Sequence, residues 1–172
     1  MIYDIVKYGN NPVLETRAEE IAEFGTEELD KLIADMFESM YAAKGVGLAA
    51  PQIGIGKRIA VIDTSAGQDE KAKLVLINPE IIHTEGSQRD EEGCLSLPGF
   101  REPVTRPKRV IVRAQDATGK TFELTGQDLL ARALVHETDH LNGRLYIGHI
   151  SALKRDLIRR KVRKLIKAGE WS

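Results

Sequence analysis

The stretch that best defines the fold and the chemistry is Leu134-Val135-His136-Glu137-Thr138-Asp139-His140-Leu141. Apolar residues recur in and before it at helical spacing, and Gly143 follows as a terminator, so we predict a helix over residues 127–141. The i, i+4 spacing of His136 and His140 places both imidazoles on one helix face, within reach of one metal ion. Glu137 lies beside that face, where a base acting on metal-bound water would sit. Two surface histidines flanking a glutamate by chance are the alternative, and we favour the metal site.

The two histidines need a third ligand, because a catalytic metal usually takes three protein ligands and leaves a position for water. In the longer pattern HExxHxxGxxH the third histidine is replaced by Tyr146, and no Glu lies between Glu137 and Glu170. The chain contains one cysteine, Cys94, and a thiolate binds zinc or ferrous iron well. A cysteine packed in the core is the alternative. The incomplete two-histidine site favours Cys94 as the ligand.

A glycine-rich segment at residues 45–52 reads Gly-Val-Gly-Leu-Ala-Ala-Pro-Gln. It contains the dinucleotide fingerprint GxGxxA, but it follows a predicted helix and runs into Pro51, so we do not expect nucleotide binding. We interpret it as an extended segment whose backbone can approach a ligand closely. It ends in Gln52, whose amide can donate to an oxyanion. A plain connection from helix to strand is the alternative.

The remaining patterns predict an α+β fold. A helix is expected over residues 26–44, with Thr26 as its N-cap and Gly45 as its stop. Short β-rich runs between turn residues predict antiparallel strands at 58–63, 74–78, 110–114 and 121–124. A third helix is predicted in the basic segment 153–172. We therefore expect antiparallel sheets packed around a central helix that carries HExxH, with an N-terminal and a C-terminal helix, in a single domain over residues 1–172.

Composition excludes several classes of protein. The chain has 172 residues, of which 42% are hydrophobic and 30% charged, so it can bury a core and is not disordered. No apolar run approaches the roughly 18 residues of a membrane span, and the N-terminus lacks a signal-peptide pattern. We expect no membrane association and a cytoplasmic location. One cysteine also excludes an intramolecular disulfide.

The net charge of −1 divides unevenly along the chain. Residues 153–172 carry a net charge of +6, and residues 1–152 carry −7. A basic helix of this kind is suited to contact the phosphates of a nucleic acid. A solvated polar helix face is an equally weighted alternative.

Three segments, residues 45–52, 92–96 and 136–140, occur in an order and at a spacing that closely resemble the peptide deformylases, over nearly the whole chain. The resemblance implies that Cys94, His136 and His140 bind one divalent metal ion, ferrous iron, with zinc, nickel or cobalt as substitutes. It implies that Glu137 is the general base and acid. The amide of Gln52 and the N–H of Leu95 would form the oxyanion site.

The resemblance also implies a reaction, the removal of the N-formyl group from the N-terminal methionine of newly synthesised proteins. Metal-bound water would attack the formyl carbon while Glu137 takes the proton and returns it to the leaving amine. Gly47 matches a position whose backbone pairs with the substrate peptide, and Arg101 one near the substrate's later residues. The expected partners are formyl-methionyl nascent peptides and the ribosome, and the enzyme is expected to be a monomer.

Two other functions fit parts of the sequence. An HExxH zinc peptidase is one, but the missing third histidine speaks against it. A non-catalytic binding protein with a deformylase fold is the other, and the intact Glu137, Gln52 and Cys94 speak against that.

Two positions depart from the family pattern. Arg132 stands where some relatives have an aliphatic residue, and we expect its guanidinium to point to solvent while its stem packs. Gly148-His149 stands where the family often has Asp-Arg, which puts a supporting ion pair in doubt. We expect His149 and His83 to be structural or exposed.

Overall fold

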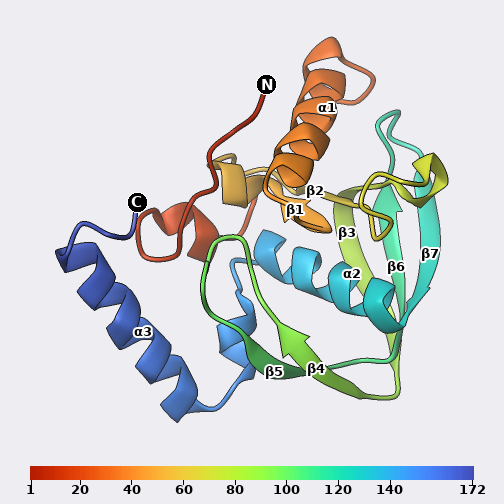
Figure 1. Cartoon of the computed structure of the whole chain (residues 1–172). Coiled ribbons are helices and arrows are strands. Elements are labelled where there is room, and N and C mark those ends of the chain that lie inside the picture. Colours follow the sequence, from red (N-terminus) through yellow and green to blue (C-terminus); the bar gives the residue numbers. More distant parts are fainter.

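The computed structural model describes residues 1–172 (Figure 1). Its helices are α1 (Glu27–Ala42), α2 (Asp128–Leu141) and α3 (Ala152–Lys167), with short 3-10 helices η1 (Pro12–Glu15), η2 (Ala50–Ile53), η3 (Glu70–Ala72) and η4 (Tyr146–His149). Its strands are β1 (Gly47–Ala49), β2 (Ile59–Ile62), β3 (Leu74–Glu85), β4 (Gln88–Glu92), β5 (Glu102–Arg106), β6 (Arg109–Gln115) and β7 (Thr121–Gln127). None of the helices has the length and apolar character that crossing a membrane requires.

A five-stranded antiparallel sheet in the order β1-β2-β3-β6-β7 forms the framework, and β4 and β5 form a separate antiparallel pair. Successive side chains of a strand point to opposite faces. In the fully buried β2, Ile59 and Val61 pack with α1, whereas Ile62 joins a cluster that includes Leu134 of α2. The sheet is therefore covered by α1 on one face and by α2 on the other.

Helix α2 lies between the five-stranded sheet and the β4–β5 pair (Figure 1). It contacts β1, β2, β3, β6 and β7 on one side and β5 on the other. The helix ends where Gly143 takes a φ of +77°, and a Cβ atom there would lie 2.8 Å from the carbonyl oxygen of Glu15. Only glycine fits this turn without strain.

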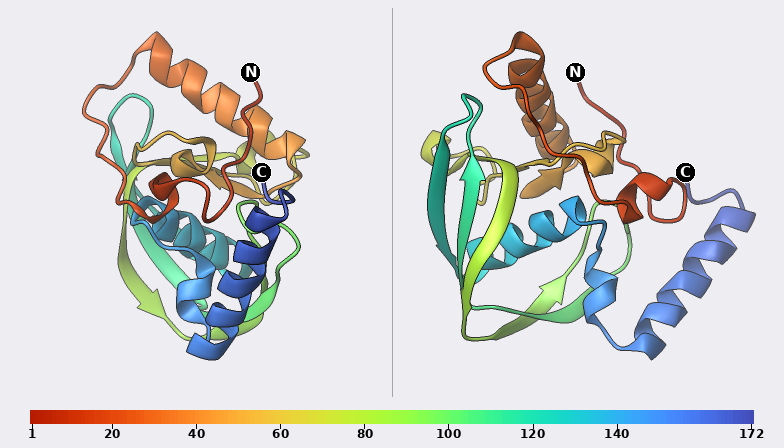
Figure 2. Two further views of the ribbon diagram at one scale, coloured as in Figure 1. Left: turned by 90° about the vertical axis from the view of Figure 1, so that its left-hand side faces the viewer. Right: turned by 180° about the vertical axis from the view of Figure 1, so that it is seen from behind.

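Helix α3 lies on the outside of the molecule beside the N-terminal segment (Figure 2). Its buried residues Ile158 and Val162 join a cluster with Tyr8, Leu14 and Trp171. Sequence segments from both ends of the chain thus share one apolar core.

The predicted helices form. Thr26 caps α1 by accepting a hydrogen bond from the N–H of Leu29, and α2 covers nearly all of the predicted 127–141. The helix predicted in the basic segment 153–172 is α3, which ends at Lys167 before Gly169 turns the chain with a φ of +71°. Its apolar stripe is only partly buried, since Leu153 is 72% exposed.

The four predicted strands form, but three strands were missed. Strand β3 continues seven residues beyond the predicted end at Asn78, because register shifts accommodate Pro79. The missed strands are β1, β4 and β5. Strand β1 has three residues, and β4 reads Gln-Arg-Asp-Glu-Glu, which lacks the apolar alternation of a half-buried strand.

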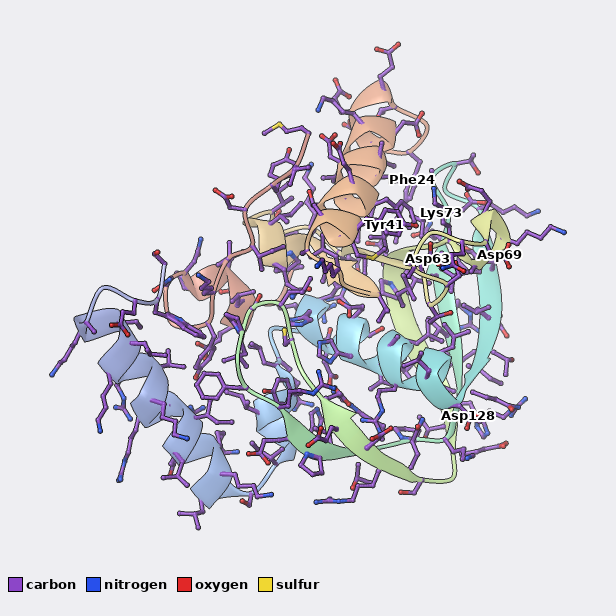
Figure 3. The ribbon with its side chains drawn as sticks, in the orientation of Figure 1. Phe24, Tyr41, Asp63, Asp69, Lys73 and Asp128 are labelled. Atoms are coloured by element: carbon purple, nitrogen blue, oxygen red, sulfur yellow. The ribbon has the colours of Figure 1, made fainter.

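Asp63 fixes the chain after β2 to helix α1 (Figure 3). Its carboxylate is fully buried and accepts hydrogen bonds from the Tyr41 hydroxyl, the Ser65 N–H and hydroxyl at 2.8 and 2.6 Å, and the Gly67 N–H at 3.0 Å. Burial by itself raises the pKa of Asp63, but the hydrogen bonds from Ser65, Tyr41 and Gly67 outweigh it and lower the pKa.

We expect Asp63→Asn to lower the free energy of unfolding by about 1–3 kcal/mol at neutral pH, because hydrogen bonds to a charged acceptor are lost. The folded pKa lies below the ordinary value of 3.8. The contribution is therefore present above that value and lost as pH falls through the folded pKa. Urea unfolding at neutral and acidic pH measures both effects, with the exposed, unpaired Glu23→Gln as control. An equal loss at both pH values would contradict this account.

Candidate active site

Three potential metal ligands meet where α2 faces the segment between β4 and β5. The Sγ of Cys94 lies 3.4 Å from the Nε2 of His140, which lies 3.2 Å from the Nε2 of His136. All three ligand atoms lie within 4.8 Å of one another. One thiolate and two imidazole nitrogens are the donor set that zinc and ferrous iron accept, so the residues fit a divalent metal ion of this kind.

The buried carboxylate of Glu92 orients one of these ligands. Its Oε1 lies 2.7 Å from the Nδ1 of His136, which leaves the Nε2 facing Cys94 and His140. Such a carboxylate fixes the tautomer and the ring orientation of a metal-binding histidine.

Two arginines neutralise Glu92. Arg106 donates to both carboxylate oxygens at 2.9 and 2.8 Å, and Arg132 donates to Oε2 and to the carbonyl oxygen of Val104. Burial raises the pKa of Glu92, but the hydrogen bonds from Arg106 and His136 lower it far below its usual range. Glu92 is therefore ionised inside the protein.

Arg132 corrects a prediction. Its guanidinium does not point to solvent; the residue is only 6% exposed and its side chain is held by Glu92. The favourable charge of Glu92 explains why a cation is tolerated at this position.

His149 takes part in the same network from the surface. Its Nε2 lies 2.8 Å from Asp139, and Asp139 accepts from the Nη1 of Arg106 at 2.8 Å. The sequence departure at 148–149 therefore does not leave Asp139 without partners. His149 is part of the supporting structure, and His83 is exposed, as expected.

Glu137 is confined by the closest approach of β1 to α2. A Cβ atom at Gly47 would lie 2.6 Å from the Oε2 of Glu137 and 2.9 Å from its Cδ, so only glycine leaves room for this side chain. Glu137 is 5% exposed, and its Oε1 has no hydrogen-bond partner in the protein. Burial raises the pKa of Glu137 to about 7.

Gln52 and Leu95 lie beside the cysteine. The Oε1 of Gln52 accepts from the N–H of Ala49 at 3.0 Å, which orients its Nε2 toward the Oγ of Ser96 at 3.3 Å and the Sγ of Cys94 at 3.5 Å. The N–H of Leu95 donates to no acceptor in the protein. Both groups offer donors close to the potential metal ligands.

An open pocket of about 500 Å³ joins these groups. Seven of the eight residues that the sequence singled out line it, namely Gly47, Gln52, Cys94, Leu95, Arg101, His136 and Glu137. The eighth, His140, is buried behind them. Sequence reasoning assigned no role to Glu92, Arg106 and Asp139. The position of Glu92 directly before Gly93-Cys94 was the one sequence signal for its role.

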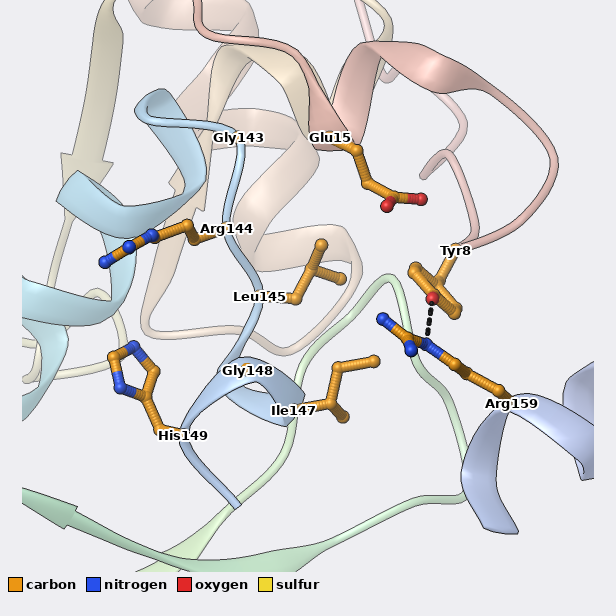
Figure 4. Close-up of a pocket in the computed structure, with 9 residues that line it drawn as sticks. All are labelled: Tyr8, Glu15, Gly143, Arg144, Leu145, Ile147, Gly148, His149 and Arg159. Carbon is orange, nitrogen blue, oxygen red and sulfur yellow. Dashed lines mark hydrogen bonds between the residues drawn. The ribbon is translucent and has the colours of Figure 1, made fainter. Parts of the chain in front are cut away.

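A second pocket, of about 490 Å³, lies between η4 and α3 (Figure 4). It contains Arg144, His149 and Arg159, and the Nε of Arg159 donates to the Tyr8 hydroxyl at 3.1 Å. None of the eight predicted site residues lines this pocket.

The fold and the site define a class of protein: an α+β protein in which one cysteine and two histidines that could bind a metal ion lie beside an open pocket. The family follows from comparison with known proteins. The family model described as polypeptide deformylase matches residues 2–156. The chain therefore belongs to the polypeptide deformylase family, and it is an enzyme of that family.

Individual relatives agree along the whole chain. The peptide deformylase of Acidobacterium capsulatum is 60% identical over 171 residues, covering 99% of both chains, and that of Thermodesulfovibrio yellowstonii is 52% identical over 160 residues, covering 93% of this chain and 96% of its own. The crystal structure of a peptide deformylase from Legionella pneumophila superposes with a TM-score of 0.89 at 43% identity, covering 100% and 99%. That from Thermus thermophilus has a TM-score of 0.87 at 39% identity, covering 95% of each chain.

We expect Glu92→Gln to lower the free energy of unfolding by about 3–5 kcal/mol, because it leaves buried guanidinium groups without their anion. Urea unfolding in the presence of a chelator measures this without a contribution from metal. The neighbouring Glu91→Gln is the control, and since its side chain is 62% exposed we expect a change within about 0.5 kcal/mol. Equal stability of the two variants would show that Glu92 is not the anchor of this network.

Proposed function

We propose that this enzyme is a metal-dependent hydrolase that removes the N-formyl group from the N-terminal methionine of newly synthesised proteins. The observation that carries the proposal is the convergence of Cys94, His136 and His140 beside the buried Glu137, in a chain of the deformylase family. The family match does not favour the alternative of an HExxH peptidase.

In this proposal Cys94, His136 and His140 hold one divalent ion, ferrous iron, with zinc, nickel or cobalt as substitutes. The ion supplies Lewis acidity to the formyl oxygen and lowers the pKa of water. The helix α2 that carries HExxH is then the central element of the fold, because it presents two of the ligands on one face and Glu137 beside that face.

Glu137 is proposed to move the proton. Its unpartnered Oε1 is free to accept a proton from the attacking water and to donate it later to the leaving amine. The steric limit at Gly47 keeps the carboxylate in one position during both steps.

Gln52 and Leu95 are proposed to stabilise the negative charge that develops on the formyl oxygen. The Gln52 Nε2 and the free N–H of Leu95 are donors at the wall of the pocket that contains Cys94. A donor of this kind contributes about 3 kcal/mol to transition-state stabilisation.

The substrate peptide is proposed to bind along β1. This strand is at the edge of its sheet and pairs only with β2, so the backbone of Gly47 can pair with an extended peptide. Arg101, which also lines the pocket, would meet the residues that follow the methionine.

We further propose that residues 1–172 form one catalytic domain that acts as a monomer in the cytoplasm. The exposed cations of α3 are the feature that would contact ribosomal RNA, and a solvated helix face is the competing interpretation.

The proposed reaction predicts a substrate preference. We expect the iron-loaded enzyme to cleave formyl-Met peptides and to leave acetyl-Met peptides intact, and we expect Glu137→Gln to lower kcat by at least about 100-fold while metal content stays unchanged. Glu123→Gln, on the exposed face of β7, is the matched control. Equal cleavage of both peptides, or a fully active Glu137→Gln variant, would overturn the proposal.

The proposed ligand set predicts the metal content. We expect Cys94→Ser to weaken metal binding by more than about 100-fold. Loss of a residue that only hydrogen-bonds to a metal ligand already lowers metal affinity by about 10- to 100-fold. Elemental analysis of anaerobically purified protein and competition with a chelator measure the affinity. His83→Ala, at an exposed histidine in β3, should bind metal as the wild type does. Unchanged affinity of Cys94→Ser would exclude the cysteine as a ligand.

A further inference from the structure

The last residues of the chain dock back onto the body of the enzyme. After α3, the chain turns at Gly169 and buries Trp171, which is 6% exposed. The indole Nε1 donates to the carbonyl oxygen of Tyr8 at 2.7 Å, and the side chain of Asn10 donates to the carbonyl oxygen of Trp171 at 3.0 Å. The C-terminal tryptophan is therefore held in a defined position rather than left in solvent.

Trp171 contacts the wall of the substrate pocket. Its ring meets the ring of Phe100 edge to face, with centroids 6.0 Å apart and an interplanar angle of 71°. Phe100 lines the pocket together with Cys94 and Arg101. Its neighbours Pro98, Gly99 and Arg101 are exposed, so Phe100 is the residue of this turn that packs against the apolar cluster containing Trp171.

A second connection runs through the backbone of Tyr8. Its carbonyl accepts from Trp171, and its N–H donates to the carbonyl oxygen of Ser96 at 2.9 Å. The hydroxyl of Ser96 in turn accepts from Gln52. One residue of the N-terminal segment thus joins the C-terminal tryptophan to the segment that carries Cys94 and Leu95.

We propose that Trp171 is a positioning residue for the substrate: it holds the segment Phe100-Arg101 as a wall for the peptide residues that follow the N-terminal methionine. The inference rests on the proposed function, since it concerns how a formylated peptide is bound. Neither Phe100 nor Trp171 is one of the groups proposed to bind the metal, move the proton or stabilise the oxyanion. Loss of Trp171 should therefore affect binding of a long substrate and spare the chemical step.

Kinetics test this separation. We expect Trp171→Ala to raise KM for a formyl-Met tripeptide about two- to tenfold, the value of an aromatic pair, with kcat within a factor of two of the wild type. For a formyl-Met substrate without further residues, both constants should stay unchanged. Trp171→Phe keeps an aromatic ring but removes the indole N–H, so it should restore most of the KM. Leu153→Ala, at an exposed residue of α3, is the control.

Fluorescence gives a measurement that needs no turnover, because Trp171 is the only tryptophan of the chain. We expect its emission to change on titration with the unformylated tripeptide product. The Phe100→Leu variant should show no such change in emission. The emission spectrum of this variant without peptide tests whether Trp171 is still buried.

The two proposals can fail separately. If the wild type does not deformylate any peptide, the proposed function fails, whereas the fluorescence titration still tests the wall. The inference would be overturned if the wild type is active but its tryptophan emission does not change when the peptide is added, and if the folded Trp171→Ala variant has an unchanged KM. Circular dichroism establishes that each variant is folded at the assay temperature. A KM increase that is equal for long and short substrates would also overturn it, because it would indicate a general loss of structure.

Discussion

The buried carboxylate of Glu92 is the interaction on which the rest of the site depends. It lies at the end of β4 and binds Arg106 of β5, Arg132 of α2 and His136 of the same helix. Burying one charge is costly unless it is paired and hydrogen-bonded on several sides, and here it has three partners from two elements, β5 and α2. Satisfying that charge fixes the β4–β5 pair against α2. Since Cys94 follows Glu92 by two residues, the same contact brings the thiol to the two histidines.

Two backbone segments that line the pocket are the edge strand β1 at Gly47 and the residues Phe100 and Arg101. Gly47 of the edge strand β1 touches Glu137 so closely that no side chain fits between them. The half-buried Phe100 and the exposed Arg101 also line the pocket, and the ring of Phe100 packs edge to face against Trp171 near the C-terminus. Residue 171 lies outside the matched range of the family model, 2–156, yet it reaches the pocket through one aromatic contact. Segments that are distant in the sequence therefore meet at this pocket.

Local patterns predicted the helices well and the sheets incompletely. Helical periodicity and end signals identified α1 and α2, because both are read within one segment. Strand β4 was missed since its residues are polar and it pairs with β5 away from the main core. The helix predicted in the basic segment 153–172 also forms, and the chain turns at Gly169 after its end.

The sequence by itself determined the helix with its two histidines, the single thiol and the glycine-rich segment, since each depends on residue type and short spacing. It also carried the family resemblance that the comparisons confirmed. Only the tertiary structure decided that Arg132 turns inward, that His149 contacts Asp139 and that Trp171 packs against Phe100. These contacts join residues that are 10 to 71 positions apart in the sequence, so the spacing of residues within one helix or strand could not predict them. Whether a charge or a ring finds a partner depends on which elements are packed together, and that packing is a property of the whole fold.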